Sequence, residues 1–357
     1  MTDFADKMID ILNYGSLNLA IGIGYKHKIF DAMENRNAPL TVAALSEKTG
    51  LNARYLREWL GIMVTGNVLE LVQGNPPEEK DRYFLPPSHA AVLTRNAGPN
   101  NLGVYAQEIP LLTISALAGV ESGFKTGEGV PFSAYPDFQQ FMSELADAKH
   151  EQTLIQDFLP SVDNGRLVAQ LEQGIKVCDI GCGQGVALRL MADAFPRSQF
   201  TGIDNHAGAI AAAKKAHERC PNLEFLMIDA ADLKNKAAFH HRFHYVTAFD
   251  AIHDQSHPLA ALQGIHHMTA PDGLFSMVDI KAGSRHRDNL DHPLGPFLYT
   301  VSLMHCMPVG LNNQGRGLGM MWGRQKALAF LKQAGFERTD VLEIPNDGFN
   351  LHFLCRK

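Results

Sequence analysis

The stretch IKVCDIGCGQG, residues 175–185, decides the fold of this chain. An apolar run ends in Asp179, glycines alternate at positions 181, 183 and 185, and the helix-like segment VALRLMADAF follows. A strand, a glycine turn and a helix in this order form the first unit of a doubly wound α/β sheet. Glycines let a ligand lie against the backbone, and the N-terminal end of a helix favours a negative group.

Two cofactors are compatible with such a turn, a nicotinamide dinucleotide and S-adenosylmethionine (SAM). Asp179 would face the diphosphate of a dinucleotide, which is unfavourable, whereas the ammonium and sulfonium groups of SAM would attract it. The glycine spacing is GxGxG, while a dinucleotide fold usually has GxGxxG. The sequence therefore favours SAM over NAD(P).

Two further acids follow the next two predicted strands. SQFTGID ends in Asp204, where an acid typically accepts hydrogen bonds from ribose hydroxyls. LEFLMIDAADL carries Asp229 and Ala230, which suit an adenine ring. Each acid taken alone is also compatible with an ordinary turn. Three acids after three successive strands favour a cofactor site.

Residues 175–280 resemble the class I SAM-dependent methyltransferases, and VCDIGCGQG is close to the first motif of that family. The resemblance implies an α/β fold, a doubly wound Rossmann-like methyltransferase sheet. It also implies SAM as cofactor and S-adenosylhomocysteine as product. The cofactor-binding residues that follow from it are Asp179, Gly181, Gly183, Asp204, Asn205, Asp229, Ala230 and the backbone of Phe249.

The segment from residue 41 to residue 86 predicts a winged helix. Thr41 is expected to cap one helix that ends at Gly50, and Asn52 to start a second. VLELV and RYFLP are expected as strands flanking the tip NPPEEKD, residues 75–81. Spacings of three and four residues place one set of side chains on a shared face of the second helix: Tyr55, Leu56, Trp59, Leu60 and Met63. With this domain, the chain is similar to dimeric small-molecule O-methyltransferases of the plant type, and more closely to a bacterial group with largely unassigned substrates.

The charges of the winged helix disfavour DNA binding. A helix that reads DNA needs an excess of Lys and Arg to neutralise phosphates. From Thr41 to Glu70 the balance is zero, with Lys48, Arg54 and Arg57 opposed by Glu47, Glu58 and Glu70. We therefore expect this domain to serve in packing, dimerisation or lining a substrate pocket, and expect no nucleic acid partner.

The fourth predicted strand runs into AFDAIHDQSHP, residues 248–258. His253 lies four residues beyond Phe249, and an imidazole with an ordinary pKa of about 6.5 suits proton removal near neutral pH. In the plant-type enzymes a His-Asp pair at this place supplies the base. His253 and Asp254 match that pair, although Gln255 stands where a Trp often follows. A catalytic base and a wall of the pocket both remain open for His253, and His305 is a second candidate base.

Two segments outside the glycine turn supply candidates for an acceptor pocket. Residues 97–175 are expected to be mainly helical, with a loop at ESGFKTGEGVPFSAYP, residues 121–136. In the family, an insertion after the fifth strand covers the acceptor, and GRGLG at 315–319 could form its flexible lid. The candidate acceptor-binding residues are Tyr135, Phe138, Met142, Tyr299, Met304 and Trp322. Core packing, an interface or a surface loop explains these features as well.

Length and composition predict two domains with an intervening connector. The chain has 357 residues, 45% of them hydrophobic, and a formal net charge of −6. We expect a winged-helix and dimerisation domain at 1–95, a helical connector at 96–165 that contributes to the acceptor pocket, and a SAM-binding domain at 166–357 with a lid insertion at about 285–323. No signal peptide and no run of about 18 apolar residues is evident, so a membrane is not expected. Five scattered cysteines suggest the cytoplasm.

These features predict a SAM-dependent methyltransferase that acts on a small molecule, with O-methylation favoured over S- or N-methylation and a homodimer expected. Two alternatives remain, a ligand-sensing regulator that uses the winged helix on DNA and an NAD-dependent oxidoreductase. The run HHRFH at 240–244 lacks a converging Cys or carboxylate pattern. No metal is therefore expected.

Overall fold

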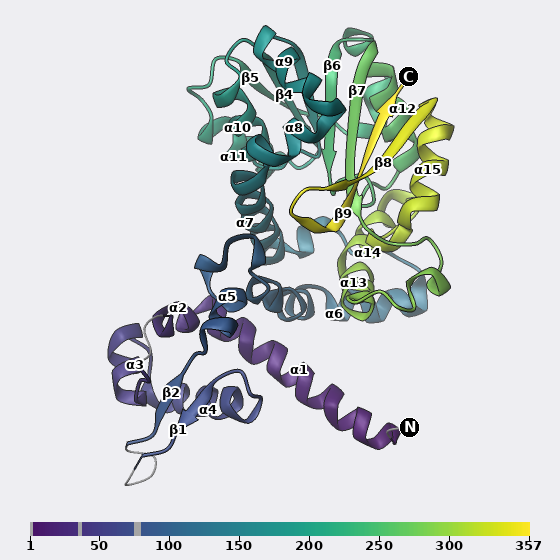
Figure 1. Cartoon of the computed structure of the whole chain (residues 1–357). Helices are drawn as coiled ribbons and strands as arrows, with labels where there is room; N and C mark the ends of the chain where they lie inside the picture. Colours follow the sequence, from purple (N-terminus) through teal and green to yellow (C-terminus); the bar gives the residue numbers. More distant parts are fainter. Residues whose placement is uncertain (1–2, 35–37, 75–79) are drawn as a thin grey trace. The chain divides into compact units, whose positions relative to one another are not determined.

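The computed structural model describes residues 3–34, 38–74 and 80–357. The chain divides into two compact units, Met1–Ile114 and Ser115–Lys357 (Figure 1). Most of the predicted wing tip, residues 75–79, lies outside the described residues.

The first unit contains the predicted winged helix. Its elements are α1 (Phe4–Lys26), α2 (Ile29–Met33), α3 (Val42–Thr49), α4 (Ala53–Thr65), β1 (Glu70–Val72), β2 (Arg82–Phe84) and α5 (Pro87–Leu93). The Thr41 hydroxyl accepts a hydrogen bond from the Ala44 amide at 3.2 Å and so caps α3. Gly50 ends α3 with φ +70°, and Asn52 caps α4. The predicted helix boundaries are therefore confirmed.

The buried face of α4 differs from the prediction at one position. Leu56, Trp59, Leu60 and Met63 are buried, and the Trp59 indole donates to the Ala20 carbonyl at 2.8 Å. Tyr55 is 82% exposed. At about 100° per residue the four buried side chains form a stripe centred about 90° from Tyr55 around the helix. The prediction that Tyr55 shares a face with the other four was therefore wrong.

The second unit is built on a seven-stranded sheet of order β5-β4-β3-β6-β7-β9-β8. The strands are β3 (Lys176–Ile180), β4 (Gln199–Asp204), β5 (Leu223–Met227), β6 (Phe243–Phe249), β7 (Thr269–Ile280), β8 (Arg338–Ile344) and β9 (Asp347–Arg356). β3 to β7 pair in parallel, and β9 is antiparallel to both β7 and β8. The predicted Rossmann-like sheet is confirmed.

Helices connect and cover the strands of this sheet (Figure 1). They include α7 (Pro136–Thr153), α8 (Leu159–Ser161), α9 (Arg166–Gln173), α10 (Val186–Ala194), α11 (Ala207–Ala216), α12 (Pro258–Met268), α13 (Gly295–Val301), α14 (Met307–Gly310) and α15 (Gly323–Ala334). Two segments wind as single π-helical turns, Leu154–Phe158 and Ser302–Cys306.

Two local predictions are corrected by the structure. The helix α6 (Glu108–Thr126) continues through ESGFKT, so the predicted loop begins only after residue 126. Strand β8 was missed, since RTDVLEI mixes charged with apolar residues at the open edge of the sheet.

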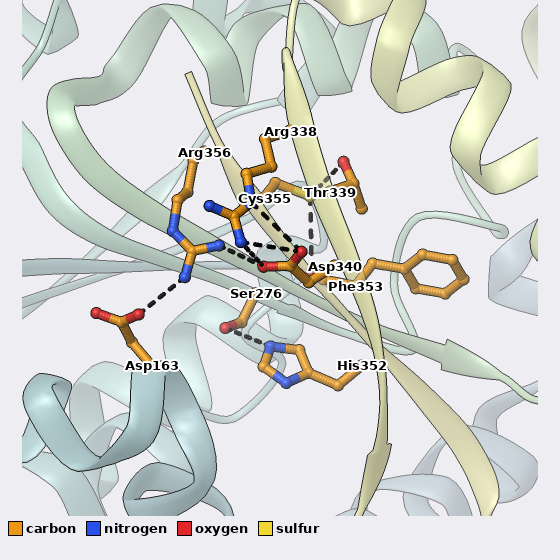
Figure 2. A network of polar contacts seen from close by, with 9 residues as sticks. All are labelled: Asp163, Ser276, Arg338, Thr339, Asp340, His352, Phe353, Cys355 and Arg356. Atoms are coloured by element: carbon orange, nitrogen blue, oxygen red, sulfur yellow. Dashed lines mark hydrogen bonds and ion pairs between the residues drawn. The ribbon is translucent and has the colours of Figure 1, made fainter.

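Polar contacts fix the antiparallel hairpin to the rest of the sheet (Figure 2). The Arg356 guanidinium on β9 donates to Asp340 of β8 at 2.7 Å and to Asp163 at 2.8 Å. His352 Nε2 lies 2.8 Å from the Ser276 hydroxyl on β7. His352 and Arg356 are four residues apart and so lie on one face of β9, which these contacts link to the neighbouring strands and to Asp163.

Within the described ranges, one helical segment, Gly103–Thr126, is long and apolar enough to cross a membrane by length and composition alone. A core helix of a soluble protein passes the same test, so this is weak evidence for a span.

Candidate active site

The glycine turn connects β3 to α10 at the carboxyl edge of the parallel strands. Gly181, Gly183 and Gly185 have φ angles of +74°, +53° and +81°, a region that favours glycine. A Cβ on Gly181 would lie 2.5 Å from Cβ of Ala251, and one on Gly185 would lie 2.3 Å from the Phe225 ring. A Cβ on Gly183 would meet nothing within 4 Å. Packing therefore requires Gly181 and Gly185, whereas Gly183 borders open space.

Asp204 joins the end of β4 to the glycine turn. Its Oδ2 accepts a hydrogen bond from the Gly183 amide at 2.9 Å, and its Oδ1 accepts one from the His206 amide at 2.8 Å. A carboxylate has about four lone-pair sites, so each oxygen can still accept from a ligand hydroxyl. Asn205 beside it is exposed.

Asp179 lies at the turn with little compensation for its charge. It is 3% exposed and accepts one hydrogen bond, from the Thr247 hydroxyl at 2.6 Å. Burial raises the pKa of this carboxyl to about 7, an effect that the hydrogen bond opposes and the nearby Asp204 charge reinforces. A cation at this place would supply the missing partner.

The third acid and the end of the fourth strand complete this edge of the sheet. Asp229 follows β5, and its Oδ1 accepts a hydrogen bond from the Ala231 amide at 2.9 Å. Ala230 is buried. The ring of Phe249 packs against Phe158 with ring centres 5.5 Å apart, and so points into the core.

His253 follows β6 and has a carboxylate at each ring nitrogen. Its Nδ1 lies 2.8 Å from Asp279 Oδ1, and its Nε2 lies 3.5 Å from Asp254 Oδ1. Asp279 is buried near the end of β7, and the same oxygen accepts a hydrogen bond from the Ile280 amide at 2.8 Å. The acid that orients the imidazole is therefore Asp279 and not its sequence neighbour Asp254.

Sequence reasoning missed Asp279, although a signal was present. FSMVDI is apolar except for Ser276 and Asp279, and an acid at the carboxyl end of a parallel strand is a candidate site residue. Burial opposes protonation of His253, but the charges of Asp279 and Asp254 and the hydrogen bond to Asp279 raise its pKa well above the ordinary value. The ring therefore binds a proton readily.

His305 lies in the π-helical turn beside this pair, among aromatic rings. Ring centres of Tyr135 and Phe138 both lie 4.8 Å from it, and the Tyr135 hydroxyl donates to the Met304 carbonyl at 2.8 Å. Burial lowers the pKa of His305, so its ring is neutral near neutral pH. Among the described residues, its buried Nε2 has no hydrogen-bond partner.

Three other acceptor-binding candidates have contacts or exposures of their own. Trp322 is 1% exposed and packs against Phe330 in the core beneath the sheet, with ring centres 5.9 Å apart. Packing accounts for the position of Trp322, and its role in acceptor binding stays a prediction. The Tyr299 hydroxyl accepts a hydrogen bond from the Asn289 amide at 3.0 Å, and Met142 is 36% exposed.

Comparisons with known proteins agree with this architecture. Residues 15–95 match the model of the Rv2258c-like winged HTH domain, and residues 171–295 match the model of a methyltransferase domain. The chain is similar to the trans-aconitate 2-methyltransferase of Acidovorax sp. (strain JS42), at 39% identity over 56 residues. That match spans 16% of this chain and only 20% of the relative's length.

Two solved structures are similar over nearly the whole chain. Human N-acetylserotonin methyltransferase in complex with SAM has a TM-score of 0.68 at 18% identity, with 99% of this chain and 98% of that chain covered. Mitomycin 7-O-methyltransferase has a TM-score of 0.64 at 18% identity, with the same coverage. At these identities the likeness establishes the fold.

The expected architecture is thus confirmed, a winged helix followed by a methyltransferase domain. That domain implies SAM as the cofactor, and the residues present fit it. Asp179 is a buried carboxylate that pairs with no cation among the described residues, Gly183 borders open space, and Asp204 keeps free lone pairs beside it. The Asp179 carboxylate suits the ammonium of SAM, and the open space at Gly183 suits its methionine part close to the backbone. The Asp204 oxygens suit the ribose hydroxyls.

Proposed function

We propose that the chain transfers the methyl group of SAM to a hydroxyl of a small molecule, with His253 as the base. The observation that carries this proposal is the Asp279–His253 hydrogen bond, 2.8 Å long, at the end of the strand next to the cofactor turn. An imidazole whose Nδ1 is held by a carboxylate presents Nε2 as the proton acceptor.

The cofactor residues divide their roles according to charge and shape. Asp179 binds the ammonium, Gly181 and Gly183 allow the methionine part to lie against the backbone, and Asp204 with Asn205 takes the ribose. Asp229, Ala230 and the backbone of Phe249 take the adenine side. SAM supplies an electrophilic methyl group when bound. The chain aligns the acceptor, excludes water and removes the hydroxyl proton at His253 Nε2.

The acceptor faces the rings around His305. Tyr135 and Phe138 come from the segment 96–165, which therefore contributes to the acceptor side, and Met304 comes from the insertion 285–323. These apolar walls suit a flat, largely apolar molecule. Neutral His305 provides a polar contact for it, and Asp254 lies between the two histidines, 4.0 Å from His305 Nδ1.

A calorimetric titration with S-adenosylhomocysteine tests the cofactor assignment. We expect saturable binding of S-adenosylhomocysteine and none of NADH. Binding of NADH without S-adenosylhomocysteine would restore the oxidoreductase alternative. Incubation with SAM and a panel of phenolic acceptors, followed by mass spectrometry, tests O-methylation, and methylated thiols or amines alone would contradict it.

A homodimer is part of the proposal. The first unit carries a 23-residue helix, α1, with an exposed apolar surface made of Phe4, Met8, Ile9, Ile11, Leu12, Leu19 and Ile23. Exposed apolar area of this extent favours coverage by a protein surface. A second copy fits because the same face is available on each chain. Light scattering should give twice the chain mass, and Leu12→Lys should yield a monomer.

A reducing, cytoplasmic location completes the proposal, since Cys178, Cys182, Cys220, Cys306 and Cys355 are all free thiols.

A further inference from the structure

Three kinds of metal-ligating atom lie close together on the acceptor side of the site. They belong to His253, Asp254 and Cys306. Nε2 or Nδ1 of the histidine, a carboxylate oxygen and the cysteine Sγ all lie within 4.8 Å of one another. His253 and Cys306 are buried and Asp254 is half-buried. We propose that this set binds a soft divalent cation, Zn²⁺ in particular.

One separation within this set matches that of neighbouring ligands in a tetrahedral site, and the other ligand atoms lie within 4.8 Å. His253 Nε2 and Asp254 Oδ1 are 3.5 Å apart. Bonds of about 2.0–2.3 Å to zinc place neighbouring ligand atoms roughly 3.3–3.7 Å apart in a tetrahedron. Asp254 Oδ1 is buried and has no hydrogen-bond partner among the described residues, so its lone pairs are available. Binding requires Cys306 Sγ to leave its present partner, His305 Nδ1, 3.6 Å away.

The outer contacts of His253 are those that a metal-binding histidine requires. Its Nδ1 is 2.8 Å from Asp279 Oδ1, so Nε2 is the nitrogen that faces the other two ligands and must release any proton it carries when the metal binds. A carboxylate on the far nitrogen fixes the ring and increases its basicity toward a metal. Asp279 is itself held by the Ile280 amide at 2.8 Å.

A second set of potential ligands, Asp250, His253 and Asp279, is less suitable. Its Nδ1–Oδ1 separation of 2.8 Å is that of a direct hydrogen bond, so no cation fits between these two atoms. In the first set a carboxylate and a thiolate carry two negative charges that balance Zn²⁺, and three ligands leave one position open.

Binding of the cation has a consequence that rests on the proposed function. The cation occupies the Nε2 lone pair that His253 needs as a base. Zn²⁺ is therefore an inhibitor of hydroxyl methylation. Cys306 was not a site candidate in the sequence, although the neighbouring His305 was.

Cobalt binding to the full-length chain tests the site directly. After treatment with a chelator, titration with Co²⁺ should saturate at one equivalent and show the near-ultraviolet absorption of a thiolate–cobalt bond, and Zn²⁺ should abolish it. Cys306→Ser should remove the band, whereas the matched control Cys220→Ser, at a partly exposed cysteine of the same unit, should keep it. Asp279→Asn should weaken Co²⁺ binding about 10- to 100-fold.

No thiolate band in the wild type, or an unchanged band in Cys306→Ser, would overturn the metal site. If Cys306→Ser loses its circular dichroism spectrum, Asp254→Asn replaces it as the test variant. It retains the thiol and should bind Co²⁺ more weakly, and unchanged affinity refutes the site. Titration of the same samples with S-adenosylhomocysteine is independent. Its failure alone counts against the methyltransferase and leaves the metal site standing.

Discussion

His253 and Asp279 are 26 residues apart in sequence and are joined by a 2.8 Å hydrogen bond between Nδ1 and Oδ1. His253 follows β6, and Asp279 lies near the end of β7. The two strands are parallel neighbours, so their carboxyl ends meet at the same edge of the sheet. The contact gives His253 a fixed orientation. It also shows that Asp279, and not the sequence neighbour Asp254, holds Nδ1 of the imidazole.

Asp279→Asn should lower turnover by about 10²- to 10⁴-fold, the range by which a positioned proton acceptor accelerates a reaction. The amide cannot stabilise the imidazolium that forms as the acceptor loses its proton. Binding of S-adenosylhomocysteine should be unchanged. Steady-state kinetics with an acceptor identified by the mass-spectrometric screen measures the first quantity, and calorimetry the second. His253→Ala should match this loss; full activity in either variant would remove the base assignment.

Asp204→Ala should weaken S-adenosylhomocysteine binding by about 1–3 kcal/mol, the cost of removing hydrogen bonds in a buried site. The substitution also frees the Gly183 amide, which Asp204 holds at 2.9 Å. Asp204→Asn retains one acceptor oxygen and should lose less. Equal affinity of wild type and Asp204→Ala in calorimetry would contradict the ribose role.

Gly183→Ala should impair cofactor binding while costing little more stability than a matched control. Gly183 and Gly50 both have positive φ and open space around a built Cβ, so alanine at either costs about 1–2 kcal/mol of backbone strain. Only Gly183 lies at the proposed cofactor site. Urea unfolding should therefore show similar losses for both variants, and S-adenosylhomocysteine titration a loss for Gly183→Ala alone. Normal binding by that variant would place the cofactor elsewhere.

Cofactor binding should release protons near pH 7. Burial raises the pKa of Asp179 to about 7, so about half of the unliganded molecules carry a neutral carboxyl there. A ligand ammonium favours the charged form and expels the proton. The binding enthalpy should therefore vary with the ionisation enthalpy of the buffer, more so in wild type than in Asp179→Asn. Identical buffer dependence would show that Asp179 does not pair with the ligand.

The fold should lose stability in mild acid through His352. Burial lowers the pKa of this histidine to about 4, while the unfolded chain titrates near the ordinary value of 6.5. Between these values the unfolded state binds more protons, so the stabilisation is complete above pH 6.5 and falls as pH drops toward 4. From pH 7 to pH 5 the contribution is about 2 kcal/mol. Urea unfolding should show that His352→Gln loses less free energy of unfolding between pH 7 and pH 5 than the wild type does. Parallel pH profiles of the two proteins would refute the assignment.

Much of the fold was predictable because its signals are local. The glycine turn, the N-caps Thr41 and Asn52, and the strands that end in Asp204 and Phe249 all depend on neighbouring residues in the chain. Where burial is decided by distant elements, prediction failed: Tyr55 is exposed. Strand β8 was missed because an edge strand lacks the apolar run of a buried one.

The sequence by itself determined the winged helix, the glycine turn with its three strand-end acids, and His253 as a candidate base, since each depends on residues close together in the chain. Only the tertiary structure decided the partners of that base. Asp279 reaches Nδ1 from the next parallel strand, and Cys306 approaches from a π-helical turn 53 residues away from His253. The physical reason is that side-chain contacts between separate elements depend on how the strands align and how the insertion packs, which no local pattern encodes.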